Sequence, residues 1–286
     1  MENKSYPKIK NAILLCLLLL GIQLAAGLIF GIFMGLFGFE NDSMINGIGL
    51  IFINLLTFGL VIFIGYKKTN KKFNEVFLFN SISLNFWIAI IVFMFGFVIL
   101  SSELDNLLNY LLPMPELLQD VFNTMLANEN IFLSIILVGI IPAFVEEMLF
   151  RGVILGGFRE NYSRKKAIIA SSLLFGIIHL NPWQFVTAFV IGIISAWICL
   201  QTKSVLPSIY MHLFNNTLTV LVMKYGGVIS IKGFNTAYYD RTFQPLWFNA
   251  IGIILTGIGA LLLINSIKKA KNGTSLNVSE PSQPGP

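Results

Sequence analysis

The sequence predicts an all-α membrane protein, a polytopic helical bundle of about eight transmembrane helices with a site inside the bundle. Hydrophobic residues make up 56% and charged residues 12% of its 286 residues, and the mean hydropathy is +0.78. Ordinary globular domains have about a quarter of their residues charged, and a soluble core could not bury this much apolar surface. The apolar residues also gather in runs near the roughly 20 residues that a helix needs to cross hydrocarbon. The lipid bilayer is therefore the expected surroundings of the chain.

The expected spans follow one another along the chain, separated by short polar or basic connections. They are centred on residues 12–38, 45–66, 84–102, 131–150, 166–180, 183–201, 205–223 and 247–267. Residues 113–130 carry apolar side chains at helical spacing beside acidic ones, which is typical of a helix on the outer membrane surface. After residue 267 the chain becomes polar and rich in Lys, Asn, Ser, Gly and Pro, which predicts a disordered end.

These features divide the chain into four parts. Residues 1–129 hold the N-terminal spans and the outer amphipathic segment, and residues 130–222 hold the candidate functional residues, among them Glu146, His179 and His212. Residues 223–267 hold an outer loop and the last span, and residues 268–286 form a disordered cytoplasmic tail.

The distribution of lysine and arginine predicts the orientation. With the N terminus in the cytoplasm, 16 of the 19 basic residues fall in inner connections, and only Lys224, Lys232 and Arg241 in outer ones. Basic residues are enriched on the cytoplasmic side, so both termini are expected there. The pI near 9.1 then reflects topology, and no nucleic-acid partner is expected. The high content of Ile, Asn, Lys and Phe favours an AT-rich bacterial genome, and hence a bacterial cell membrane.

Ionisable residues inside apolar segments are concentrated in one part of the chain. The two histidines, His179 and His212, lie in strongly apolar segments, downstream of a Glu146–Glu147 pair that ends another apolar run. Charges and imidazoles are costly at membrane depth, so they mark a functional site by default. Taken singly, an acidic pair suits an interfacial ion pair and a histidine suits a contact between helices, but their co-occurrence favours a working site.

Helical spacing separates the two glutamates. Arg151 lies one turn beyond Glu147 on the same face, where it is expected to hold that carboxylate ionised. Glu146 points about 100° away, so it needs another partner or a proton and is the better candidate for a general base. Pro142, one turn earlier, removes a backbone donor and is expected to kink the helix at the acidic pair.

Two more helices complete the set. His212 and Asn216 are one turn apart and face the same way, so three helices offer Glu146, His179, His212 and Asn216 to a common interior. Depths counted from the cytoplasmic ends disagree: His179 should lie about 20 Å deep, and Glu146 and His212 about 10 Å or less. Either the fifth segment is tilted or shallow, or the boundary of the fourth run is wrong by a turn.

These residues carry a resemblance to a known family. The ordered motifs are Glu146-Glu147-x-x-x-Arg151, Phe175-x-x-x-His179 and His212-x-x-x-Asn216. They resemble the motif set of the CPBP intramembrane proteases, also called Abi, which include type II CAAX prenyl endopeptidases and bacteriocin-processing or immunity proteins. The resemblance covers about residues 130–222, which it identifies as a CPBP-type catalytic core. It implies an all-helical, eight-span fold and peptide hydrolysis inside the bundle.

The resemblance also implies a role for each residue. Glu146 would activate the attacking water, helped by His179. His212 and Asn216 would stabilise the oxyanion of the tetrahedral intermediate. Glu147 and Arg151 would hold the helix in place.

A metal is a second possibility for the same residues. Glu146, His179 and His212 could form a three-ligand site for zinc or another divalent metal, with an open position for water. The HExxH signature is absent and asparagine is a poor zinc ligand, so a water activated directly by Glu and His is slightly preferred. No organic cofactor is expected, and nothing in the sequence indicates an oligomeric state.

The expected substrate is a membrane-associated peptide or protein. No residue selects a lipidated tail over a bacteriocin leader or a pheromone precursor, and a bacterial origin favours peptide processing or bacteriocin self-immunity. The alternative is a non-catalytic membrane immunity or scaffold protein. A proton-coupled transporter is less favoured, because the Glu-Glu and His motifs have no second copy of the kind that transporter repeats produce.

Overall fold

The computed structural model describes residues 5–39, 42–116, 118–119, 130–225, 230–234 and 242–276, with side chains described as far as residue 270. Within these residues the regular secondary structure is helical, with one isolated bridge between Phe79 and Ser204, so the all-α prediction is confirmed. The helices, with η for a π-helix, are α1 (Ile9–Phe37), α2 (Ser43–Thr69), α3 (Phe73–Val76), α4 (Leu84–Leu111), α6 (Ile131–Ser134), η1 (Ile135–Ile140), α7 (Ile141–Glu147), η2 (Met148–Ile154), α8 (Leu155–Asn161), α9 (Arg164–Ile177), α10 (Pro182–Thr202), α11 (Leu206–Tyr225) and α12 (Leu246–Leu276).

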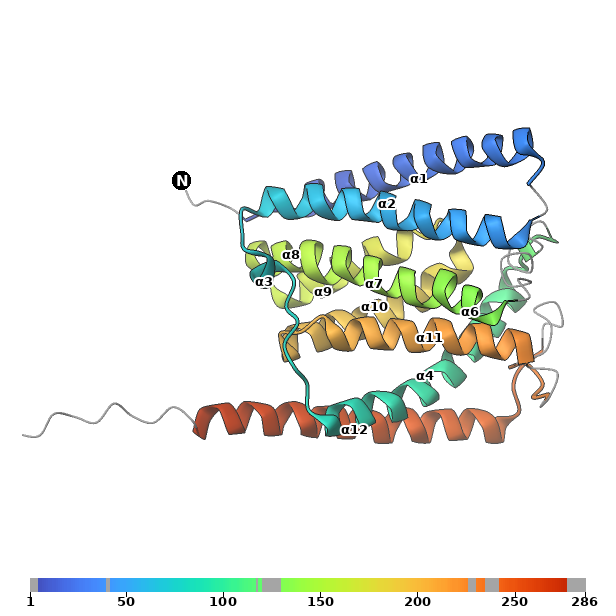
Figure 1. Cartoon of the computed structure of the whole chain (residues 1–286). Coiled ribbons are helices and arrows are strands. Elements are labelled where there is room, and N and C mark those ends of the chain that lie inside the picture. The colour runs from blue at the N-terminus through green and yellow to red at the C-terminus, as the bar shows by residue number, and fades with distance from the viewer. Residues whose placement is uncertain are drawn as a thin grey trace, which may run out of the picture.

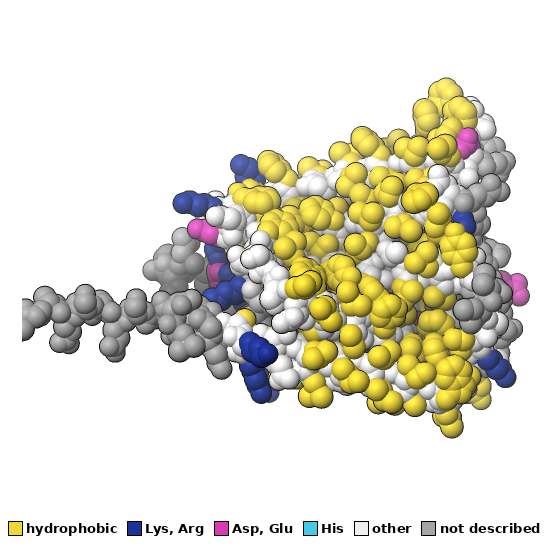
Figure 2. Space-filling model, turned by 60° about the horizontal axis from the view of Figure 1, so that its bottom comes forward, with side chains coloured by type: hydrophobic (Ala, Val, Ile, Leu, Met, Phe, Trp, Pro, Cys, Tyr) yellow, Lys and Arg dark blue, Asp and Glu magenta, His cyan; other side chains and the backbone are white. Residues whose placement is uncertain are grey.

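The long helices lie side by side as a bundle (Figure 1). The first residues of α1 and the last of α12 lie at the same end of it, as an even number of crossings requires. Lys and Arg side chains gather at that end, and a broad belt of hydrophobic side chains covers the face shown in Figure 2. Leu28 and Ile32 of α1 are 60% and 63% exposed. Such exposure of large apolar side chains fits a surface that faces lipid.

Six of the described helices are long and apolar enough to cross a membrane. They are Ile9–Phe37, Ser43–Thr69, Leu84–Leu111, Ile131–Asn161, Pro182–Thr202 and Leu246–Ala270. The predicted fifth span corresponds to α9, which has 14 residues and so reaches about 21 Å. The predicted seventh span, α11, carries Asn215, Asn216 and Thr217 in its middle. α9 packs against α10, and α11 packs against η1 and α7. An integral membrane protein is supported, while the number of crossings stays a prediction.

Two predicted segments meet the limits of the described residues. Most of the outer amphipathic segment at 113–130 lies outside them. The predicted C-terminal tail at residues 268–286 overlaps α12, which continues to Leu276, and residues 277–286 lie outside the described residues. Lysine is a good helix former, so the basic stretch after residue 267 continues the helix rather than ending it.

The predicted end of the fourth span near residue 150 is wrong. Helicity continues without a break from Ile131 to Asn161, and Arg151 is 3% exposed instead of lying in an inner connection. Glu146 is therefore 15 residues from either end (146 − 131 and 161 − 146), or about 22 Å along the helix. His179 is likewise 15 residues beyond the first residue of α9 (179 − 164). The disagreement in depth disappears because the fourth helix is longer than predicted.

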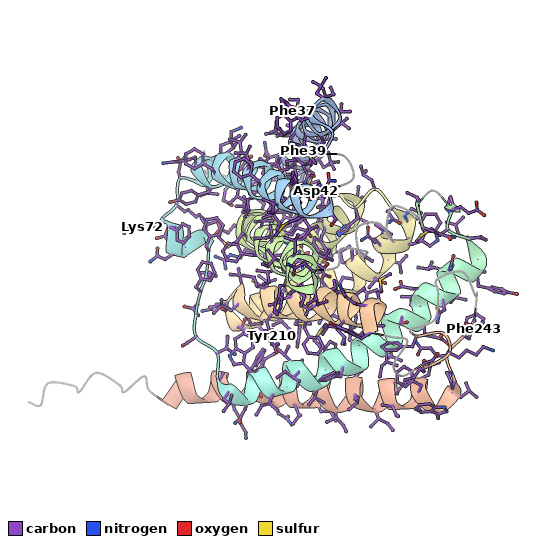
Figure 3. All side chains as sticks on the ribbon, turned by 45° about the vertical axis from the view of Figure 1, so that its right-hand side comes forward. Phe37, Phe39, Asp42, Lys72, Tyr210 and Phe243 are labelled. Atoms are coloured by element: carbon purple, nitrogen blue, oxygen red, sulfur yellow. The ribbon has the colours of Figure 1, made fainter. Side chains whose placement is uncertain are left out.

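The long helix over Ile131–Asn161 is the centre of the bundle. It packs against α2 on one side and α11 on the other, an order of layers that Figure 3 also shows. The start of α11 is recessed, since Ser204 and Val205 are 0% and 1% exposed, so His212 lies deeper than a count from a surface turn predicts. The acidic pair thus faces protein instead of lipid.

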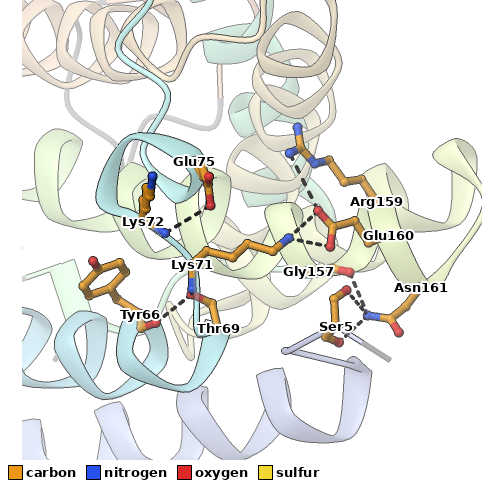
Figure 4. Close-up of polar contacts among 10 residues, drawn as sticks. All are labelled: Ser5, Tyr66, Thr69, Lys71, Lys72, Glu75, Gly157, Arg159, Glu160 and Asn161. Carbon is orange, nitrogen blue, oxygen red and sulfur yellow. Dashed lines mark hydrogen bonds and ion pairs between the residues drawn. The ribbon is translucent and has the colours of Figure 1, made fainter. Parts of the chain in front are cut away.

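Polar contacts hold the C-terminal end of this central helix (Figure 4). Glu160 forms an ion pair with Lys71, which follows α2. The Asn161 side-chain amide donates to the carbonyl and hydroxyl oxygens of Ser5, at 2.6 and 3.1 Å. Exposed ion pairs contribute little stability, but these contacts join the central helix to both the N-terminal segment and the α2–α3 connection.

A close crossing of α4 and α12 gives a test of the fold. A Cβ atom at Gly259 would overlap the backbone of Phe93, whereas one at Gly257, two residues away on α12, would meet nothing within 4 Å. Gly259→Ala is expected to destabilise the protein by about 1–3 kcal/mol through overpacking. Gly257→Ala is expected to be neutral or slightly stabilising, since alanine favours the helix. Thermal unfolding of the purified variants measures both, and equal melting temperatures would contradict the crossing.

Candidate active site

The first element of the site is a buried ion pair on the central helix. Arg151 Nε lies 3.1 Å from Glu147 Oε2, and the two side chains are 0% and 1% exposed. The i,i+4 pair predicted from spacing is therefore confirmed. Neither atom makes a well-aligned hydrogen bond with the other, so charge holds the pair. Arg151 also donates from Nη2 to the Gly192 carbonyl of α10, at 3.4 Å.

The second element is a contact that spacing did not predict. His212 of α11 places Nδ1 3.3 Å from Glu147 Oε1, so this histidine meets Glu147 and not the neighbouring Glu146. A carboxylate accepts, so Nδ1 carries the hydrogen and Nε2 is left for another partner. This arrangement, in which a carboxylate orients an imidazole, fixes the tautomer and ring direction of the histidine.

An aromatic ring from α9 lies among the charged groups. Phe175 is 2% exposed, and its ring centroid is 4.7 Å from Arg151 Cζ. Its edge-to-face contacts reach His212 at 5.6 Å and His179 at 5.2 Å. The ring stacks a cation and orients two imidazoles. The motif Phe175-x-x-x-His179 already contained this residue, but its position between the two histidines could not be read from it.

His179 lies in the turn just beyond α9. Its Nδ1 is 2.8 Å from the Phe175 carbonyl oxygen, which can only accept, so Nδ1 donates and Nε2 is free. The next residue, Leu180, has a φ of 52°, and Asn181 then caps α10 through its side chain. The turn holds a half-buried imidazole, whose Nε2 has no hydrogen bond to the part of the chain that the structure describes.

Glu146 differs from its neighbour in having no charged partner. Its Oε2 atom is buried and has no hydrogen-bond partner among the described residues. An unpartnered buried carboxylate oxygen is costly, so this atom needs a proton, a water or a substrate group. This is the property expected of a group that acts on a ligand instead of holding the fold.

Asn216 contacts the central helix above the acidic pair. Its Nδ2 donates to the Val138 carbonyl at 2.9 Å, and its Oδ1 accepts from Asn215 Nδ2 at 3.3 Å. The structure therefore places the six predicted residues on three neighbouring segments. It joins Glu147, Arg151 and His212 directly, ties His179 to them through Phe175, and attaches Asn216 to a separate turn.

The side chains of Glu146, His179 and His212 are of the types that bind zinc, but they are not arranged as a metal site. Two free imidazole nitrogens and a carboxylate are ligands that zinc accepts. Within the described parts of the chain, however, no three His, Cys, Asp or Glu side chains are grouped as metal ligands. The residues as arranged do not form the three-ligand set expected from the sequence.

Comparison with known proteins matches this part of the chain. Residues 128–218 match the family model described as type II CAAX prenyl endopeptidase Rce1-like. The "Putative membrane peptidase YdiL" of Bacillus subtilis (strain 168) is 31% identical over 90 residues, which are 32% of this chain and 37% of that protein. No solved structure gives a significant match. The resemblance read from the motifs is thus confirmed, and over residues 128–218 this chain is similar to the CPBP family of intramembrane proteases.

Proposed function

We propose that this protein is an intramembrane endopeptidase that hydrolyses a membrane-associated peptide with a water activated by Glu146 and His179. The observation that carries the proposal is the buried Oε2 of Glu146, which has no hydrogen-bond partner among the described residues. The adjacent Glu147 is instead paired with Arg151. A carboxylate placed like that of Glu146 can accept a proton from water, as a general base must. The free Nε2 of His179 can orient the same water.

The chemistry balances with these residues alone. Water attacks the scissile carbonyl carbon while its proton passes to Glu146, and the C–N bond then breaks as that proton goes to the leaving amine. The oxyanion formed between these steps needs donors. Asn216 offers an amide hydrogen, and His212 offers Nε2–H when it is protonated. Glu147, whose Oε1 lies 3.3 Å from Nδ1, accepts from that nitrogen and orients the ring.

The substrate belongs to the proposal as well. The site lies about 22 Å along the central helix, so the peptide must enter the bundle from the membrane. Peptide processing or bacteriocin self-immunity is the proposed setting. Mass spectrometry of membrane and secreted peptides from cells with wild-type protein or Glu146→Gln, at matched expression, tests it. A cut peptide found only with wild type supports proteolysis. Identical profiles with a preserved cellular phenotype would favour an immunity or scaffold role instead.

The direct mechanism predicts insensitivity to metal removal. Dialysis of the purified protein against a strong zinc chelator is expected to leave the rate of peptide cleavage unchanged, because Glu146 and His179 act on water without an ion. A known zinc peptidase treated in parallel shows that the chelator works. Loss of activity that zinc restores would assign the reaction to a metal held by Glu146, His179 and His212 in a rearranged site.

A further inference from the structure

The missing backbone donor at Pro142 is linked to α11 by one side chain. In an α-helix, residue 142 would donate to the carbonyl of residue 138, but proline has no N–H to give. The preceding turns are π-helical, with the Ile141 N–H reaching the Ile136 carbonyl. Asn216 Nδ2 donates to the Val138 carbonyl at 2.9 Å, the acceptor that Pro142 cannot serve.

This contact holds the amide of Asn216 in one orientation. A carbonyl oxygen can only accept, so the nitrogen of the amide must face Val138 and its oxygen must face away. The oxygen accepts from Asn215 at 3.3 Å. One amide hydrogen is therefore used by Val138, and the second points away from that carbonyl.

The same contact helps to seat α11 on the central helix. α11 is bonded at two places, His212 to Glu147 and Asn216 to Val138, and Glu146 lies between them in the sequence. The helices approach closely there, because a Cβ atom at Gly139 would lie 2.9 Å from Thr217 Oγ1. The distance and rotation of α11 relative to Glu146 thus depend on this turn.

We propose that Pro142 is a positioning residue, which leaves the Val138 carbonyl open to Asn216 and so fixes the position and orientation of the Asn216 amide. The Val138 carbonyl is a fixed acceptor for the Asn216 amide. Pro142 has no N–H, so it cannot donate a backbone hydrogen bond to that carbonyl. π-helical turns of this kind are frequent at functional sites. The catalytic use of the second Asn216 amide hydrogen rests on the proposed function. The link between Pro142 and Asn216 is independent of it.

A double-mutant cycle tests the link without any substrate. The unfolding equilibrium of the purified full-length protein in lipid micelles is measured for wild type, Pro142→Ala, Asn216→Ala and the double variant. Asn216→Ala is expected to raise the unfolding constant roughly threefold in wild type, the average effect of a side-chain hydrogen bond in a membrane. In the Pro142→Ala background the helix can close on Val138, so the same change is expected to have no effect. Equal effects in both backgrounds would overturn the link.

Kinetics test the positioning role. On the peptide that wild type is found to cut, Pro142→Ala is expected to lower kcat about tenfold with KM unchanged, since small misplacement of a catalytic group is costly. Pro245→Ala, before α12 and remote from the site, is the matched control and is expected to behave as wild type. Coupling in the cycle with an unchanged kcat would overturn the positioning role. Absence of hydrolysis by wild type would overturn the proposed function and this role with it, while the cycle still decides the link.

Discussion

Glu146→Gln is expected to slow peptide hydrolysis about 10²–10⁴-fold, the contribution typical of a positioned general base. Glutamine keeps the shape of the side chain but cannot take a proton from water. Because the Glu146 Oε2 atom has no hydrogen-bond partner in the described protein, no structural contact is lost with the charge. The measurement is the initial rate in lipid vesicles on the peptide identified by mass spectrometry, with the melting temperature recorded for the same samples.

Glu147→Gln is the matched comparison, one residue away on the same helix. It removes the charge that faces Arg151 and His212, so it is expected to lower stability as well as rate. Glu146→Gln should change the rate alone. If Glu146→Gln cuts the peptide at the wild-type rate, Glu146 is not the base. If its melting temperature falls as far as that of Glu147→Gln, the carboxylate has a structural partner instead.

Arg151→Met is expected to destabilise the protein by about 3–5 kcal/mol, the usual cost of leaving one member of a buried pair without its partner. Methionine replaces most of the volume, so the lost charge dominates. Glu147 would then lie 1% exposed with His212 as its remaining partner, and the contact of Arg151 with the Phe175 ring would also disappear. The measurement is the free energy of unfolding in lipid micelles.

Two variants separate charge from packing. The double change Glu147→Gln with Arg151→Met removes both charges, and it is expected to recover much of the lost stability, since buried pairs can be replaced by neutral groups at small cost. Arg159→Met, two turns along the same helix, removes an arginine that is 36% exposed and 3.8 Å from Glu160. That change is expected to cost less than about 1 kcal/mol. A similar loss of stability for Arg151→Met and Arg159→Met would show that the buried ion pair stabilises the protein no more than an exposed one.

Much of the molecule could be predicted because it depends on neighbours along the chain. Composition and the length of apolar runs required membrane helices, since each helix satisfies its own backbone. The Glu147–Arg151 pair followed from one helical turn, and the structure has it at 3.1 Å. The ordered motifs likewise predicted the family resemblance that the match over residues 128–218 supports.

Contacts between helices could not be predicted in the same way. His212 meets Glu147 rather than Glu146, and Asn216 bonds a backbone carbonyl that no sequence pattern marks. Both depend on the rotation and axial position of α11 against the central helix, and π-helical turns change that register by part of a turn. The end of the fourth helix was misplaced for a related reason: Arg151 resembles a membrane-flanking charge, because its burial and its contact with the Gly192 carbonyl of α10 depend on another helix. Spacing along one helix is set by covalent geometry, whereas the register between helices is set by packing of side chains distant in sequence.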